Sequence, residues 1–155
     1  MKQVLVIEDQ RTSAAIIAQM LRNTGLTLEM RHAATLEDAM RLLSEQFFDL
    51  IVLDLCLPDS ADGRNTFAKV RLLSSDAPII VLTIVNDTST IKSVLDGGAK
   101  AYLVKGHISD EDFNDSVRRA LGGKLETITR QEQDAPMEIT AGGHGFFARI
   151  RGIDL

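Results

Sequence analysis

The ten residues from Ile51 to Ser60, IVLDLCLPDS, indicate both the fold and the site of this protein. An apolar run that is typical of a buried strand leads directly into Asp54, and the chain then leaves through Pro58 into a polar turn. A carboxylate at the end of an apolar strand costs free energy unless a cation or hydrogen bonds compensate for it. The stretch therefore predicts a strand that ends in an acid with a function.

The composition of the whole chain is that of a globular protein. Its 155 residues, 45% hydrophobic and 25% charged, suffice for one domain with an appendage but not for two full-sized domains. A net charge of -5 argues against a general binder of nucleic acid or of membrane surfaces. The single cysteine excludes an internal disulfide, and no apolar segment reaches the length of a signal-peptide core or a membrane span. We therefore expect a cytoplasmic protein.

Five short apolar runs, rich in β-branched residues and bounded by polar residues or glycine, predict five strands. The second run has apolar residues at alternate positions, whereas the others are continuous. Continuous apolar runs are typical of parallel strands that helices cover on both faces. The expected strands are residues 3–7, 26–31, 50–53, 79–82 and 101–104.

The segments between these runs have apolar residues at helical spacing, for example Leu36, Met40 and Leu43. Thr35 with Asp38, three residues further on, predicts a capped helix start, and a second such pair begins at residue 109. Strands and helices thus alternate five times. Because parallel strands need right-handed crossovers, this alternation predicts a doubly wound α/β sheet.

In such a sheet the residues that bind ligands lie at the carboxyl ends of the strands. Three acids crowded together repel one another and have raised pKa values unless a divalent cation joins them. Oxygen ligands suit Mg²⁺, which binds alongside phosphate oxygens, and a nearby hydroxyl and ammonium group indicate that phosphate. The residues expected at these strand ends are Glu8 and Asp9, Asp54, Thr83, and Lys105.

These five residues, in this order and each at the end of a predicted strand, resemble the site of the receiver domain of two-component response regulators, the CheY-like superfamily. The resemblance covers residues 1–122. It implies a flavodoxin-like, five-stranded parallel sheet in the order 2-1-3-4-5 with five helices. It also implies a signalling domain, not an enzyme, whose only chemistry is its own phosphorylation and dephosphorylation.

The resemblance also implies a role for each acid. Asp54 would accept a phosphoryl group from the phosphohistidine of a sensor histidine kinase or a phosphotransfer protein. Asp9 and Asp54 would bind Mg²⁺ directly, Glu8 would bind it through water, and the backbone carbonyl of Cys56 would complete the protein ligands. The charge of Asp54 would then be stabilised by Mg²⁺ and by a lysine.

The remaining family positions form the expected switch. Lys105 would contact one phosphoryl oxygen, and Thr83 would donate its hydroxyl to another once the phosphoryl group arrives. Tyr102 matches the aromatic switch position. The resemblance further implies a partner-binding surface, or a homodimer formed through the fourth helix, fifth strand and fifth helix or through the C-terminal extension.

The sequence departs from the family pattern at several positions near the site. Gly106 stands where most receivers have proline, so we expect a looser loop after Lys105. Ile84 follows the threonine where a small residue is usual. Cys56 and Val85 occupy the positions that help to place the hydrolytic water, and neither can orient water as an amide or carboxylate would. Together these residues predict a long-lived phosphorylated form.

Three alternatives accompany this interpretation. Asp9 taken alone could simply cap the first helix. The protein could be a degenerate receiver that acts as a scaffold without phosphorylation. A Mg²⁺-dependent phosphohydrolase of the haloacid-dehalogenase type would need a second acid two residues after the nucleophile, and Cys56 occupies that position.

Residues 123–155 form a C-terminal extension in which we recognise no domain. The polar stretch ETITRQEQDAP is typical of a linker. The segments MEIT and FFARIR flank a glycine-rich turn and predict a β-hairpin. The alternative is a partly disordered extension.

Overall fold

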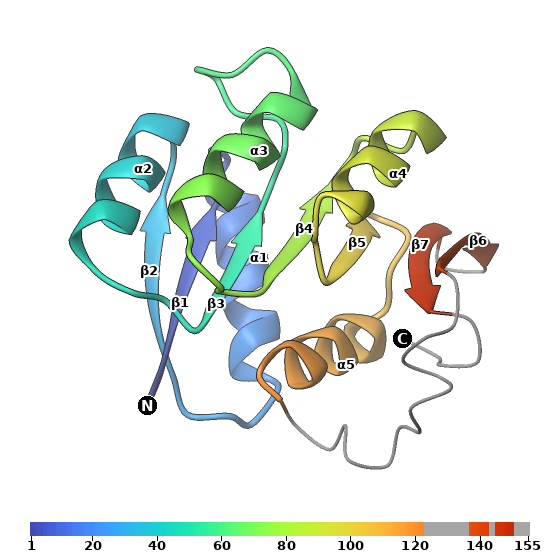
Figure 1. The fold of residues 1–155 in the computed structure, drawn as a ribbon. Coiled ribbons are helices and arrows are strands. Elements are labelled where there is room, and N and C mark those ends of the chain that lie inside the picture. The colour runs from blue at the N-terminus through green and yellow to red at the C-terminus, as the bar shows by residue number, and fades with distance from the viewer. Residues whose placement is uncertain (123–136, 143–144, 151–155) are drawn as a thin grey trace.

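The structure is a computed structural model that describes residues 1–122 and the backbone of two further strands, 137–142 and 145–150. Strands and helices alternate five times through the first of these ranges (Figure 1). The elements are β1 (Lys2–Ile7), α1 (Arg11–Arg22), β2 (Leu28–Ala33), α2 (Leu36–Glu45), β3 (Leu50–Leu53), α3 (Gly63–Leu73), β4 (Ile79–Thr83), α4 (Thr88–Asp96), β5 (Ala101–Val104) and α5 (Asp110–Ala120).

The five strands form a parallel sheet in the order β2-β1-β3-β4-β5, which confirms the predicted fold. Helices α1 and α5 cover one face, and α2, α3 and α4 cover the other (Figure 1). Within the described residues no helix has the length and apolar character that a membrane crossing requires.

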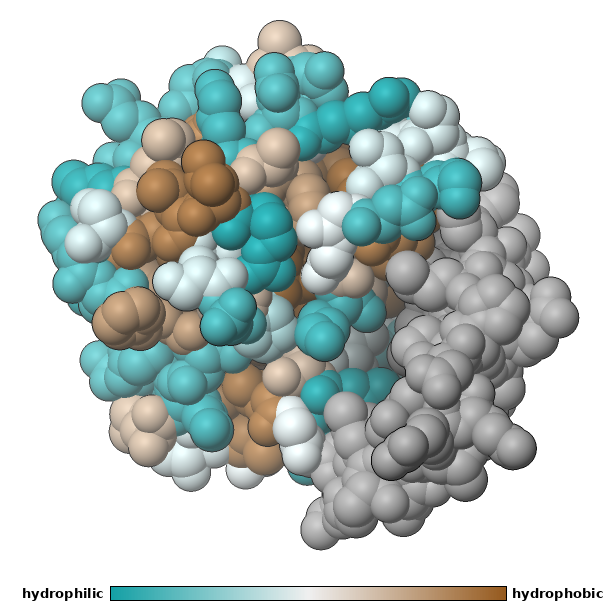
Figure 2. Space-filling view, in the orientation of Figure 1, coloured by the Kyte–Doolittle hydropathy of each residue, from teal (hydrophilic) through white to brown (hydrophobic). Residues whose placement is uncertain are grey.

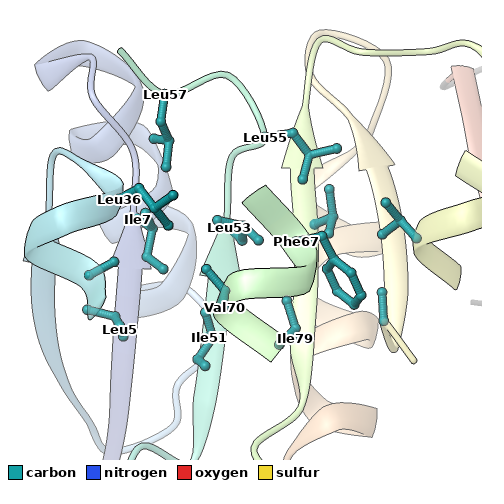
Figure 3. Packing of buried hydrophobic residues seen from close by; sticks show 14 of the residues in the cluster. Leu5, Ile7, Leu36, Ile51, Leu53, Leu55, Leu57, Phe67, Val70 and Ile79 are labelled. Carbon is teal, nitrogen blue, oxygen red and sulfur yellow. The ribbon is translucent and has the colours of Figure 1, made fainter. Parts of the chain in front are cut away.

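Each face of the sheet has its own hydrophobic core, because successive side chains of a strand point to opposite sides. Leu5 and Ile7 pack toward α2 and α3 (Figure 3), whereas Val4 and Val6 pack toward α1 and α5. All four are at most 3% exposed. This two-sided burial explains why the apolar runs of β1, β3, β4 and β5 are continuous.

The second strand begins two residues later than the sequence predicted, at Leu28 instead of residue 26. Gly25 has a left-handed backbone with φ of 75°, and the hydroxyl of Thr24 accepts a hydrogen bond from the N–H of Leu26 at 3.3 Å. These contacts place residues 26 and 27 in the turn after α1. Pairing with β1 therefore starts at Lys2 opposite Leu28.

Helix α2 is capped from two directions. The hydroxyl of Thr35 accepts the N–H of Asp38, as the sequence predicted. The carboxylate of Asp59, in the loop after β3, accepts the N–H groups of Leu36 at 2.8 Å and Glu37 at 2.9 Å. These backbone hydrogen bonds lower the pKa of Asp59 below its ordinary value of 3.8. Asp59 thus anchors the loop after β3 to α2.

Replacing Asp59 by alanine is expected to lower the free energy of unfolding by about 1 kcal/mol at pH 7, because two helix N–H groups lose their acceptor. Since the folded pKa is the lower one, this contribution is present above pH 4 and is lost as the pH falls through the folded pKa. Urea unfolding at pH 7 and pH 3 measures both effects. Asp76→Ala, which removes an exposed acid after α3, is the control. Equal stability of Asp59→Ala and this control at pH 7 would contradict the prediction.

The C-terminal extension contains the predicted hairpin. Strands β6 (Met137–Gly142) and β7 (Gly145–Ile150) pair antiparallel. The sequence did not indicate where this hairpin lies. In the structure β7 pairs antiparallel with β5, so that the sheet has seven strands in the order β2-β1-β3-β4-β5-β7-β6. The predicted linker, residues 126–136, lies outside the described residues.

Candidate functional site: an acidic pocket at the carboxyl ends of β1, β3 and β5

The three acids named from the sequence meet at one edge of the sheet. Glu8 and Asp9 follow β1, and Asp54 follows β3, which pairs with β1 through Ile7 and Leu53. One carboxylate oxygen of each acid lies within 4.8 Å of those of the other two. The adjacency of β1 and β3 is therefore what creates the acidic cluster.

The three carboxylates differ in exposure. Glu8 is fully buried and Asp54 is 4% exposed, whereas Asp9 is exposed. Backbone N–H groups hold one oxygen of each buried acid: Gln10 donates to Glu8 at 3.0 Å and Cys56 donates to Asp54 at 3.0 Å. Asp9 leaves the cluster accessible from solvent on one side.

Lys105, directly after β5, supplies the compensating cation. Its Nζ donates to Oδ2 of Asp54 at 2.9 Å and also to Glu8. Burial raises the pKa of Glu8, and the hydrogen bonds from Lys105 and Gln10 only partly offset this effect. For Lys105 burial acts to lower the pKa, but the hydrogen bonds to both acids outweigh it and the pKa is raised. Lys105 is therefore a cation at neutral pH.

The loop after Lys105 takes a conformation that suits glycine. Gly106 has φ of 81°, in the left-handed region, and the described chain has no cis peptide bond. The N–H of Lys105 donates to the carbonyl of Thr83 at 2.9 Å, which ties the start of the loop to β4. Lys105 thus reaches the acids from a loop that continues through a glycine in a left-handed conformation.

Thr83 ends β4 and is fully buried beside the pocket. Its hydroxyl accepts the N–H of Val85 at 3.4 Å and lies 3.8 Å from the sulfur of Cys56. Cys56 itself is exposed. Ile84, the next residue after Thr83, is 67% exposed, so its side chain stands in solvent close to the site.

Tyr102 is fully buried in β5, and its hydroxyl donates to the carbonyl of Val85 at 2.8 Å. Burial raises the pKa of Tyr102, which keeps the phenol protonated. This hydrogen bond connects β5 to the loop between β4 and α4. The predicted switch residue is therefore in contact with the segment that carries Thr83.

Sequence reasoning missed several contacts of the site. It did not indicate that Lys105 binds Glu8 as well as Asp54, nor that the carbonyl of Val85 accepts from Tyr102. It also did not indicate that His32 donates from Nε2 to the carbonyl of Glu8 at 2.6 Å. Its position directly after the predicted second strand was the only available signal, because backbone acceptors have no sequence signature.

The donor set of the pocket fits a hard divalent cation. Glu8, Asp9 and Asp54 offer only oxygen atoms, which suit Mg²⁺ and not a soft transition metal. The exposed carboxylate of Asp9 leaves a side on which water could complete an octahedral shell. The residues present are therefore consistent with a magnesium site.

The comparisons with known proteins agree with this geometry. The family model of the response regulator receiver domain matches residues 4–118. The response regulator ArlR of Staphylococcus aureus is 32% identical over 105 residues, which are 68% of this chain and 46% of ArlR. The transcriptional regulatory protein ZraR of Salmonella typhimurium is 26% identical over 124 residues, 80% of this chain and 27% of ZraR. The chain belongs to the response regulator receiver family.

Solved structures show the same fold. A two-component response regulator from Clostridium difficile superposes with a TM-score of 0.69 at 24% identity, covering 79% of this chain and 97% of that one. The chain spans less than half the length of the curated relatives named above.

Proposed function

We propose that this receiver takes a phosphoryl group onto Asp54 from the phosphohistidine of a sensor histidine kinase or a phosphotransfer protein. A carboxylate oxygen of Asp54 forms a bond to phosphorus, the bond from phosphorus to the histidine nitrogen breaks, and that nitrogen keeps the electron pair. The observation that carries this proposal is the buried Asp54, held by Lys105 inside a cluster of oxygen donors.

Residues around Asp54 would position the group and neutralise its charge, which suffices for phosphoryl transfer because the transition state is loose. Lys105 would hold one phosphoryl oxygen, and Thr83 would donate its hydroxyl to another. Asp9, Asp54, the carbonyl of Cys56 and, through water, Glu8 would hold Mg²⁺. When bound, Mg²⁺ would screen the phosphoryl oxygens from the acids.

The output would pass through Tyr102, whose hydroxyl contacts the β4–α4 loop. Movement of Thr83 toward the phosphoryl group would alter this contact and so bias the surface formed by α4, β5 and α5 between two states. A partner protein or a second copy would bind that surface. The absence of nucleic-acid contacts stays a prediction, because ZraR is by name a transcriptional regulator.

Beryllofluoride, a stable mimic of the phosphoryl group, tests this function. Tyr102 is the only tyrosine and the chain has no tryptophan, so tyrosine fluorescence reports on one position. We expect a saturable change in that fluorescence that needs Mg²⁺ and is absent in Asp54→Asn. An identical signal with and without beryllofluoride would favour the phosphorylation-independent scaffold.

The phosphorylated protein is expected to be long-lived, because Ile84 restricts access and neither Cys56 nor Val85 orients water. Ile84→Ala should accelerate both labelling by acetyl phosphate and loss of the phosphoryl group. Val85→Glu supplies a carboxylate that can position water, and hydrolysis at least about tenfold faster is expected, since a well-placed general base contributes about 10²–10⁴-fold.

Decay of radiolabelled phosphoprotein measures both rates. Leu72→Ala, which shortens a side chain that is 83% exposed at the end of α3, is the control for removing an exposed apolar residue. Unchanged rates in both site variants, or a wild-type phosphoprotein that decays within seconds, would show that access does not limit hydrolysis.

A further inference from the structure

The outer edge of β5 is covered by the chain itself. Strand β5 is the last parallel strand, and β7 lies beside it (Figure 1). The two strands pair antiparallel, with Leu103 opposite Phe147. Strand β6 then lies outermost. The hairpin therefore occupies part of the surface formed by α4, β5 and α5.

The backbone groups that β7 covers can be assigned from the pairing. Lys105 donates its N–H to Thr83 on β4. Because successive residues of a strand direct their N–H and C=O groups to opposite sides, those of Leu103 also face β4. The backbone groups of Tyr102 and Val104 consequently face the outer edge. Without β7, these N–H and C=O groups would have no hydrogen-bond partner in the five-stranded parallel sheet.

The same alternation identifies the residues of β7 that face β5. Since the backbone groups of Leu103 point toward β4, Leu103 and Phe147 form a non-hydrogen-bonded pair. The neighbours of Phe147 in β7, which are Phe146 and Ala148, therefore direct their N–H groups toward β5. A substitution that removes the N–H group of either residue therefore removes a hydrogen bond between β7 and β5.

An uncovered β5 would be an attractive template for another strand. Charged residues and proline protect edge strands from pairing with other chains. The sequence of β5, AYLV, contains neither. Strand β6, which takes the outer position, includes Glu138. With the hairpin in place, the edge strand of the sheet is β6, which includes a charged residue, and not β5, which has none.

We propose that the β6–β7 hairpin is an intramolecular cap on β5, which prevents this edge from pairing with a second copy of the chain. Release of the cap exposes the N–H and C=O groups of Tyr102 and Val104, and the receiver then self-associates through β5. This inference does not depend on phosphorylation of Asp54. It does imply that a homodimer through β5 forms only after the hairpin has left.

Amide hydrogen exchange of the full chain, measured by NMR, tests the cap. In the wild type, the amides of Tyr102 and Val104 should be protected, and light scattering should show a monomer. Ala148→Pro removes an N–H directed at β5. It should accelerate exchange at these two amides about tenfold or more, leave Leu103 and Lys105 unchanged, and produce concentration-dependent dimers. Ala148→Val keeps the N–H and should match the wild type.

Phe146→Pro removes the other N–H directed at β5 and serves as the second variant, and unchanged amide shifts in β1 and β3 show that the receiver stays folded. Rapid exchange of Tyr102 and Val104 in the wild type would overturn the proposal. If the wild type were a dimer with both amides protected, the hairpin of one copy would cover β5 of the other. That result would overturn the intramolecular cap. Faster exchange without any self-association in the proline variants would overturn its protective role.

Discussion

Asp54→Asn is expected to abolish labelling by acetyl phosphate, a loss of at least about a hundredfold, because the amide cannot act as the nucleophile. Both carboxylate oxygens of Asp54 accept hydrogen bonds in the pocket, one from Lys105 and the other from the N–H of Cys56. Labelling should also need Mg²⁺, since phosphate oxygens would otherwise approach three carboxylates that lie within 4.8 Å of one another.

Mass spectrometry of the labelled protein, with and without excess chelator, measures both effects. Asp76→Asn removes an exposed acid after α3, far along the chain from the pocket, and should be labelled as the wild type is. Label that survives in Asp54→Asn, or that appears undiminished in chelator, would mean that the phosphoacceptor or the role of the metal has been assigned wrongly.

Lys105→Met is expected to lower the free energy of unfolding by about 3 kcal/mol at neutral pH without Mg²⁺. Removing one partner of a buried ion pair costs about 3–5 kcal/mol, and the side chain of Lys105 is 20% exposed, which favours the lower end. The variant leaves Glu8, which is fully buried, next to Asp54 with no cation. Mg²⁺ should therefore restore more stability to the variant than to the wild type.

The deficit of Lys105→Met should depend on pH in a defined direction. Burial already raises the folded pKa of Glu8 above its ordinary value of 4.5, and loss of Lys105 removes a hydrogen bond that lowers it. A raised carboxyl pKa favours the folded state below the ordinary value, and this contribution is lost as the pH rises through the folded pKa. The deficit should thus be small near pH 4 and large at pH 7.

Urea unfolding at several pH values measures this dependence. Lys100→Met, which removes an exposed lysine just before β5, is the matched control and should have a stability close to that of the wild type. The double variant Lys105→Met with Glu8→Gln should recover part of the loss at pH 7. A metal-free Lys105→Met protein as stable as the wild type would show that the ion pair does not stabilise the fold.

The side of the receiver seen in Figure 2 combines polar side chains with several groups of apolar ones. Exposed apolar residues include Phe47 at 85% and Leu72 at 83%, and both lie near the amino ends of the strands, away from the acidic pocket. Leu72 lies near the end of α3, and its apolar side chain by itself does not tell that it faces solvent. Only the packing of α3 against the sheet decides this.

The sequence by itself determined the five strands, the five helices and the residues at the strand ends, because apolar periodicity and strand termini are local features. It also indicated the hairpin, since the glycine-rich turn lies between two short strand-forming segments. Local patterns also placed Glu8, Asp9 and Asp54 at the same edge of the sheet, because parallel strands align their carboxyl ends.

Tertiary structure alone decided how these parts meet. The contact of Lys105 with both Glu8 and Asp54 joins residues 97 and 51 positions apart, and the cap of α2 comes from Asp59 in another loop. The pairing of β7 with β5 likewise depends on backbone groups, which every residue but proline offers alike. Such contacts depend on which elements become neighbours in space, and no local pattern of side chains records that choice.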